Sequence, residues 1–263
     1  MHIERYGSGP GIYWGLHGWS GDHTTFAPLA ERLPASATLY SVDLPGYGRS
    51  PAPRRWDLTA ITDEVVSAVR SVEATEVTLV GNCSGAILGL LAAERLQGRI
   101  GRLVLIDPFA YVPWYFRLFV ETSFGKYAYY SAFANPIGRW LTNWSLRGHR
   151  QPETDLTESF ASINHEVSYQ YLALLARVEG IVQFSGLGLP IDIAYGERTF
   201  GAVKDSVLRW QSIWPHARCW ELAGAGHLPI KEATGQLSRI IFEEPGAREQ
   251  LAARSHSWSL TKG

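Results

Sequence analysis

The sequence has few cysteines and no long apolar run. It contains two cysteines, Cys83 and Cys219, which are too few for the disulfide framework on which small secreted domains depend. No apolar stretch reaches the roughly 18 residues that a membrane-spanning helix needs, so we expect no membrane span. The first residues also lack the basic flank, apolar core and small-residue cleavage site of a secretory signal. Together these absences predict a cytoplasmic protein.

An excess of charge of one sign is also missing. The net charge is −1 over 263 residues, and charged residues make up 19% of the chain. This balance gives no electrostatic case for binding nucleic acid or an anionic membrane, and we expect no nucleic-acid partner. Hydrophobic residues make up 46%, which is enough for a sizeable core. A partner must therefore be inferred from the chemistry of a site.

Short apolar runs alternate with helical patterns along much of the chain. The strand-like runs show no clean polar alternation, as expected for parallel strands covered by helices on both faces. They lie at residues 12–16, 38–43, 77–80, 103–106 and 191–195. Helical spacing of apolar residues fills several of the intervals between them. The order predicts an α/β fold with a mostly parallel central sheet flanked by helices.

The composition changes after residue 108. Aromatic residues crowd the positions that follow, and strand-like runs stop until about residue 189. We therefore expect a helical cap at residues 109–188, inserted into a core formed by residues 1–108 and 189–263. Aromatic side chains line pockets for apolar ligands, so the cap indicates a large apolar ligand. The alternative is that these side chains pack the cap's own core.

Residues 81–85 form the pentapeptide G-x-S-x-G with a cysteine in place of its serine. The pentapeptide follows an apolar run and opens a helical one, which is the strand, turn and helix setting in which this motif carries a nucleophile. The sharp turn strains the backbone of its central residue, and the two glycines let strand and helix approach. Cys83 is therefore the candidate nucleophile. The side chain of Ser84 is expected to point away from the site.

Five motifs occur in an order that is typical of one large superfamily. They are the turn at 17–19, the Gly/Pro-rich loop at 43–50, the elbow at 81–85, Leu-Ile-Asp-Pro at 105–108 and Gly-Ala-Gly-His at 224–227. With these motifs the chain resembles the α/β-hydrolase superfamily, in the branch with a helical cap. That branch includes carboxylesterases, acyl-thioester hydrolases and C–C bond hydrolases. The resemblance implies an α/β-hydrolase fold and a hydrolytic enzyme.

The base is assigned by chemistry and chain order. A nucleophilic thiol needs a base within hydrogen-bond reach, and the base needs a third group to orient it. His227 follows a predicted strand in a small-residue turn, C-terminal to the nucleophile as this fold requires. We therefore expect His227 to be the base. His17 is expected to be structural in its turn.

The acid is the member of the site that the sequence leaves open. In most relatives it ends a Gly-x-x-Asp segment, and the matching residue here is Thr199, which cannot carry a negative charge. The family also permits an acid after the strand that follows the elbow, where this chain has Asp107, and we favour that residue. Glu197 reaching across is one alternative. A Cys-His dyad is another, because a thiol of pKa about 8.5 is already partly ionised at neutral pH.

The oxyanion formed in acyl transfer needs two preorganised donors. The backbone N–H of Ser84, at the start of the elbow helix, is expected to be one. The resemblance implies that the backbone N–H of Trp19 is the other. No metal or cofactor is expected, because histidines and cysteines lack ligand spacing and the hydrolase mechanism needs none.

The cysteine indicates the class of substrate. A thiolate exchanges readily with a thioester, whose leaving thiolate departs easily. We therefore expect a hydrolase that acts through a Cys nucleophile and an S-acyl enzyme on a small-molecule acyl thioester or ester. The acyl group is expected to be bulky and apolar, and to be carried on coenzyme A or a carrier protein. A C–C bond hydrolase or lyase, an acyltransferase in secondary metabolism and a non-catalytic ligand-binding protein stay open as alternatives.

Overall fold

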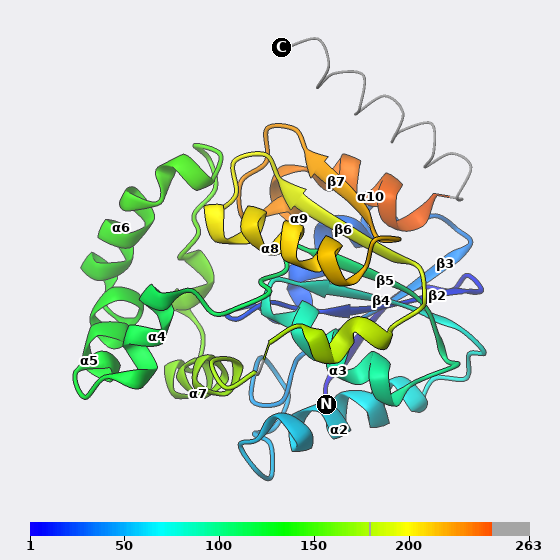
Figure 1. Cartoon of the computed structure of the whole chain (residues 1–263), viewed down its shortest axis with the longest axis horizontal. Helices are drawn as coiled ribbons and strands as arrows, with labels where there is room; N and C mark the ends of the chain where they lie inside the picture. Colours follow the sequence, from blue (N-terminus) through cyan, green and yellow to red (C-terminus); the bar gives the residue numbers. More distant parts are fainter. Residues whose placement is uncertain (179, 244–263) are drawn as a thin grey trace.

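The computed structural model describes residues 1–178 and 180–243. Its strands form one sheet in the order β1-β3-β2-β4-β5-β6-β7 (Figure 1). Their bounds are β1 (Ile3–Gly7), β2 (Gly11–Leu16), β3 (Ala37–Val42), β4 (Val77–Asn82), β5 (Ile100–Ile106), β6 (Ile191–Gly196) and β7 (Arg218–Leu222). β1 pairs antiparallel with β3, and the other neighbours are parallel. The predicted mostly parallel sheet is confirmed, and the antiparallel edge strand β1 is an addition to it.

Helices cover both faces of the sheet. Those of the core are η1 (His23–Phe26), α1 (Ala27–Ala30), α2 (Leu58–Arg70), α3 (Ser84–Arg95), α8 (Gly201–Ile213), α9 (Pro229–Glu232) and α10 (Thr234–Phe242). α2, α3 and α8 pack on one face, and α1, α9 and α10 pack on the other. Within β4, Leu79 packs with the first group and Val80 with the second, because successive strand residues point to opposite faces. Both faces are therefore apolar.

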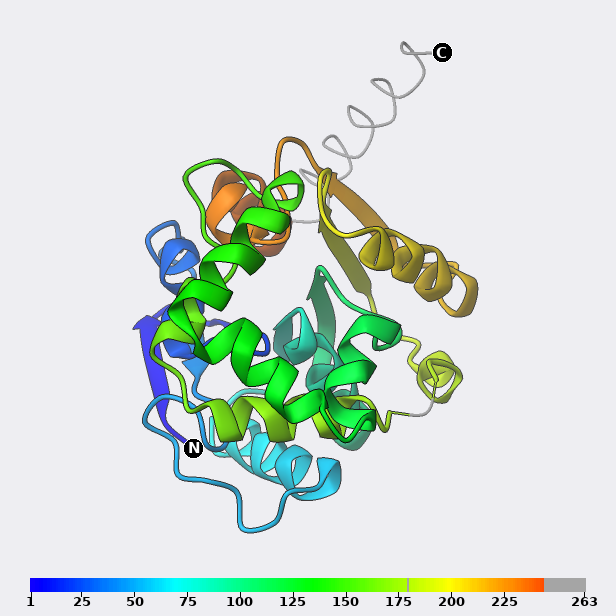
Figure 2. The ribbon, with the colours of Figure 1, turned by 90° about the vertical axis from the view of Figure 1, so that its left-hand side faces the viewer.

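The regular elements described between β5 and β6 are all helices. These are α4 (Trp114–Glu121), α5 (Gly125–Tyr129), η2 (Tyr130–Ala134), α6 (Pro136–Ser145), η3 (Arg147–His149), η4 (Glu158–Ala161), α7 (His165–Leu175) and η5 (Val182–Gly186). Figure 1 shows α4, α5, α6 and α7 grouped at one end of the molecule, and Figure 2 views that end directly. Its division from the core at residues 109–188 stays a prediction. Residues 244–263, assigned by that prediction to the core, lie outside the described residues.

None of the helices within residues 1–178 and 180–243 combines the length and the apolar character that crossing a bilayer requires.

The elbow between β4 and α3 requires its two glycines, Gly81 and Gly85. A Cβ at Gly85 would lie 2.3 Å from the carbonyl oxygens of Leu16 and His17, and one at Gly81 would lie 2.5 Å from the backbone of α3. Side chains cannot approach so closely, so only glycine lets β2, β4 and α3 meet here. The turn between them lifts Cys83 to the end of β4.

Candidate active site

Backbone strain marks the site. Cys83 has φ 50° and ψ −116°, and Asp107 has φ 47°. Among the described residues other than glycine, these two have positive φ, a conformation that costs free energy and persists where surrounding structure imposes it. The N–H of Cys83 donates to the carbonyl of Ile106, and that of Asp107 to the carbonyl of Ala194, both at 2.8 Å. Each strained residue is thus anchored to the neighbouring strand.

Asp107 and His227 are in direct contact. His227 Nδ1 lies 2.7 Å from Asp107 Oδ2, although the residues are 120 positions apart in sequence. Asp107 is fully buried, and its other oxygen accepts the N–H of Gly196 at 3.0 Å. A buried carboxylate is stable only when its oxygens accept hydrogen bonds. The structure therefore brings together the acid and the base that the sequence favoured.

Thr199 supplies a contact that sequence reasoning missed. Its buried hydroxyl donates to Asp107 Oδ2 at 2.6 Å and lies 3.2 Å from His227 Nδ1. The sequence analysis treated this position only as one that lacked an acid. The sequence did contain a hint of this contact. A threonine hydroxyl at position 199 can donate a hydrogen bond to a carboxylate that follows the neighbouring strand, where Asp107 lies. Glu197, the alternative acid, is exposed and accepts the N–H of Gly224.

The charge on His227 follows from its neighbours. Burial lowers the pKa of His227, but hydrogen bonds to Asp107 and Cys83, together with the charges of those two groups, raise it by more, to about 10. Nδ1 is engaged by Asp107, which leaves Nε2 for the sulfur of Cys83. The rings of Phe109 and Phe200 pack on the imidazole with centroids at 5.6 and 4.6 Å. These contacts fix the imidazole of His227 and favour its protonated form.

Two backbone donors lie beside Cys83. The N–H groups of Trp19 and Ser84 donate to no backbone acceptor within the described ranges, and both residues line the same pocket as Cys83. Ser84 begins α3, so its N–H is one of the free donors at a helix N-terminus. A Cβ at Gly18 would lie only 3.2 Å from Cys83 Cβ. The loop carrying Trp19 therefore packs directly on the elbow.

His17 holds this loop in place. It is fully buried, its Nε2 accepts the N–H of Leu44 at 3.0 Å, and its Nδ1–H donates to the carbonyl of Gly18 at 2.7 Å. Burial lowers the pKa of His17 to about 4, so the ring is neutral at pH 7. Tyr47 donates its hydroxyl to the carbonyl of Trp19. These bonds agree with a structural His17 and a loop at 43–50 that braces the rim of the site.

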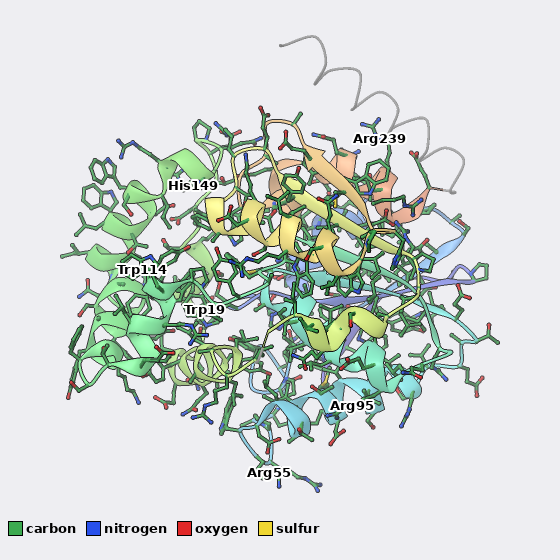
Figure 3. All side chains as sticks on the ribbon, in the orientation of Figure 1. Trp19, Arg55, Arg95, Trp114, His149 and Arg239 are labelled. Carbon is green, nitrogen blue, oxygen red and sulfur yellow. The ribbon has the colours of Figure 1, made fainter. Side chains whose placement is uncertain are left out.

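A pocket of about 950 Å³ opens onto Cys83 and His227. This volume lies within the range of small-molecule sites. Figure 3 shows Trp19, which contributes to the pocket wall, between the helices of the β5–β6 segment and the sheet. Much of the lining is aromatic or aliphatic, and includes Phe109, Tyr115, Phe116, Phe119, Phe133, Phe160, Leu172 and Leu175. The wall of the pocket beside Cys83 and His227 is therefore largely apolar.

Comparison with known proteins agrees with this geometry. Residues 16–239 match the model of the alpha/beta hydrolase family. The chain belongs to the alpha/beta hydrolase family. This confirms the superfamily expected from the five motifs and identifies an esterase-like hydrolase. The cap and the cysteine nucleophile stay predictions.

The similar proteins are esterases and related hydrolases. The hydrolase is 28% identical over 257 residues to a pimeloyl-[acyl-carrier protein] methyl ester esterase of Xanthomonas oryzae pv. oryzae, a match that covers 92% of this chain and 97% of that protein. The structure of a thermophilic esterase from Thermogutta terrifontis has a TM-score of 0.74 at 18% identity, covering 96% and 93% of the two chains. An enol-lactonase from Burkholderia xenovorans has a TM-score of 0.71 at 16% identity, covering 91% and 94%. At these identities, the two structures show a shared fold.

Within residues 1–178 and 180–243 of the hydrolase, two groups of side chains have metal-ligating atoms within 4.8 Å of one another. They are His2, Glu4 and His23, and Asp22, His23 and Asp43. In the second group Asp43 is buried and accepts hydrogen bonds from Nδ1 and the backbone N–H of His23, at 2.8 and 2.7 Å. These bonds fasten η1 to the end of β3. Neither group contains Cys83, Asp107 or His227, so the reacting residues are separate from both.

The raised pKa of His227 predicts a pH-dependent contribution to stability. The folded protein holds this proton more tightly than the unfolded chain, in which histidine has a pKa of about 6.5. The contribution is therefore complete below about pH 6.5 and is lost as the pH rises toward 10. We expect the difference in unfolding free energy between wild type and His227→Gln to shrink across this window, as measured by urea denaturation at graded pH. A difference that does not change with pH would contradict the charged state assigned to His227.

Proposed function

We propose that this hydrolase cleaves an acyl ester or thioester through an S-acyl enzyme on Cys83, with a bulky apolar acyl group carried on a carrier protein or coenzyme A. The observation that carries the proposal is the 2.7 Å contact between His227 and Asp107, with Cys83 as the other hydrogen-bond partner of the imidazole. The name of the similar pimeloyl-[acyl-carrier protein] methyl ester esterase supports a carrier-borne acyl ester. The apolar pocket supports the acyl class.

The first half-reaction forms the acyl enzyme. His227 accepts the proton of Cys83 on Nε2 as the sulfur attacks the carbonyl carbon and forms a C–S bond. The carbonyl π electrons move to oxygen, where the N–H groups of Trp19 and Ser84 stabilise the oxyanion. When the carbonyl re-forms, the bond to the leaving alcohol or thiol breaks. His227 donates the Nε2 proton to that leaving group.

The second half-reaction releases the acid. His227, now neutral, takes a proton from a water molecule as that water attacks the S-acyl carbon. The same two N–H groups stabilise the second oxyanion. Collapse breaks the C–S bond, the carboxylic acid leaves, and the proton on His227 again pairs with the sulfur. Asp107 holds the imidazole orientation in both halves, because it binds Nδ1 whichever species occupies the pocket.

The contacts favour a Cys-His-Asp triad over the other two arrangements. Asp107 is buried and bonded to His227. Glu197 is exposed and bonded to a backbone N–H instead. A dyad would leave Asp107 without a role, although its strained backbone and three hydrogen bonds hold it against the base. We further propose that the helical segment 109–188 acts as the cap, since its side chains line the pocket.

The acyl enzyme itself provides the test. After incubation with a medium-chain acyl thioester or methyl ester and an acid quench, intact-mass and peptide analysis should find one acyl group on Cys83. Cys219 is a matched control, because burial, followed by the charge of Asp192, raises the pKa of its thiol to about 11 and keeps it unreactive. The Cys219→Ser variant should form the adduct normally. Turnover without an adduct on Cys83, undiminished in Cys83→Ala, would eliminate the proposal.

A further inference from the structure

One face of α6 is apolar and uncovered. Ile137, Trp140, Leu141 and Trp144 follow one another at i, i+3, i+4 and i+7, which places them on one side of the helix. Between 50 and 71% of the surface of each is exposed. Single exposed apolar residues are ordinary, but a continuous stripe of large ones marks an interaction site.

The elements beside α6 extend this apolar surface. Trp114 and Leu118 on α4, and Phe124 and Tyr127 at α5, are also exposed. α4 packs on α5, α5 on η2, and η2 on α6, and Figure 2 shows this end of the molecule facing the viewer. Among the described residues, the large exposed hydrophobic side chains outside 114–144 are Val182 and Leu208. We call the surface formed by the eight residues on α4, α5 and α6 the outer face.

The inner side of α4 is also apolar. Tyr115, Phe116 and Phe119 of α4 line the pocket, as does Leu146 at the end of α6. Neither α4 nor α6 has a fully buried residue. Helices that are apolar on both sides are normally covered on both. A ligand in the pocket would cover the inner side of α4, which leaves the outer face in need of a partner.

The charge around the outer face is positive. Residues 109–150, which contain α4, α5 and α6, hold five Lys or Arg residues and one Glu. Arg147 donates to the carbonyl of Trp144 and forms no ion pair within the part of the chain that the structure describes. The guanidinium of Arg147 lies over the ring of Trp144, 4.6 Å from its centroid. The net charge of −1 for the whole chain does not reveal this local positive charge, because acidic residues elsewhere in the chain offset it. The sequence-level argument against an anionic membrane therefore does not apply to this face.

We propose that the outer face docks on an anionic lipid surface. Tryptophan beside arginine on an amphipathic helix is the pattern of segments that lie in a membrane interface. A second copy of the chain fits less well, because a two-fold interface would set two positively charged segments, residues 109–150 of each copy, against each other. A protein partner also fits less well, because interfaces need many directed hydrogen bonds and the α6 stripe offers only the two indole N–H groups.

Docking in this way would set the apolar pocket close to the source of its ligand. α4 carries pocket residues on one side and Trp114 and Leu118 on the other, so a single helix separates the lipid phase from the pocket. An apolar acyl group would then have a short path from the lipid surface to Cys83. The inference concerns delivery of the substrate and does not depend on the chemistry assigned to Cys83.

Vesicle sedimentation tests the proposal. The full chain is mixed with vesicles of phosphatidylcholine alone, or with about one-third phosphatidylglycerol, at low and high salt. We expect binding to the anionic vesicles that weakens with salt. Trp140→Ser/Trp144→Ser should lower the partition coefficient about ten-fold or more, and Arg147→Gln should lower it about five-fold. Leu208→Ser on α8 removes an equally exposed apolar residue elsewhere and should bind as wild type does.

Two further readouts separate the possible outcomes. Hydrolysis of a short water-soluble ester should be equal in wild type and in Trp140→Ser/Trp144→Ser, which shows that the variant is folded. Cys83→Ala should bind vesicles as wild type does, so failure of docking is distinct from failure of the proposed chemistry. The proposal is overturned if wild type binds neither vesicle, or if the tryptophan variant binds undiminished. It is also overturned if light scattering shows instead a dimer that the tryptophan variant abolishes, or if only an acidic carrier protein binds this face.

Discussion

Replacing Cys83 with alanine should lower kcat/KM by roughly 10⁴- to 10⁶-fold, the loss expected when a covalent nucleophile is removed. Cys83 is held at φ 50° at the end of β4, is hydrogen-bonded to His227, and lines the same pocket as Trp19 and Ser84. Alanine fits the same backbone but cannot form the acyl enzyme. The measurement is steady-state hydrolysis of acyl esters and thioesters. Binding of a non-hydrolysable ketone analogue of the substrate should change little, because the pocket wall is intact.

The Cys83→Ser variant tests whether the site requires a sulfur nucleophile or works equally well with an oxygen nucleophile at position 83. Serine keeps the shape of the elbow, but a hydroxyl is much less acidic than a thiol and gives up its proton less readily as it attacks. We therefore expect the serine variant to retain more activity than alanine and less than wild type. Activity above wild type on oxygen esters would show that sulfur is not required. A loss of less than ten-fold in Cys83→Ala would contradict the role given to Cys83.

Replacing Asp107 with asparagine should lower kcat on the order of 10⁴-fold, as loss of the acid's charge does in a serine triad. Asparagine tolerates the positive φ of this position and can still accept the N–H of Gly196, so the fold should persist. It would present an amide N–H to His227 Nδ1 or lose that bond, and the imidazole would adopt the wrong tautomer. Circular dichroism and urea denaturation check that the variant is folded. Activity within ten-fold of wild type would favour the dyad.

The neighbouring threonine allows a sharper version of this experiment. Thr199 Oγ1 already lies 3.2 Å from His227 Nδ1, at the position where most relatives carry their acid. Asp107→Asn/Thr199→Asp should therefore recover at least about ten-fold of the activity lost in Asp107→Asn, because a carboxylate again binds Nδ1. The matched control is Asp107→Asn/Thr199→Val, which also removes the threonine hydroxyl but introduces no carboxylate, and it should recover no activity. Failure of the double variant to exceed Asp107→Asn would show that a carboxylate at position 199 cannot replace Asp107.

The core of the fold was predictable because its signals are local. β2 to β6 and the helices α2 and α3 follow from apolar runs and helical spacing within a few residues of each other. β1 escaped detection because residues 3–7 alternate only weakly, with no fully buried position. It is a strand because the edge of β3 offers it hydrogen-bond partners. Pairing with a distant strand leaves little trace in a five-residue sequence.

What the sequence indicated by itself is the candidate nucleophile and its candidate base: Cys83 in an elbow that only glycines permit, and His227 in a small-residue turn after the last strand. Both depend on backbone geometry set by adjacent residues. The tertiary structure decided which carboxylate reaches His227, because that depends on β5 and β6 lying side by side, which brings Asp107 and Thr199 together. It also decided where the charge lies, since a net charge of −1 says nothing about Arg147 lying over Trp144 on one apolar face. Both outcomes depend on distances between residues far apart in the chain, and a sequence does not contain those distances.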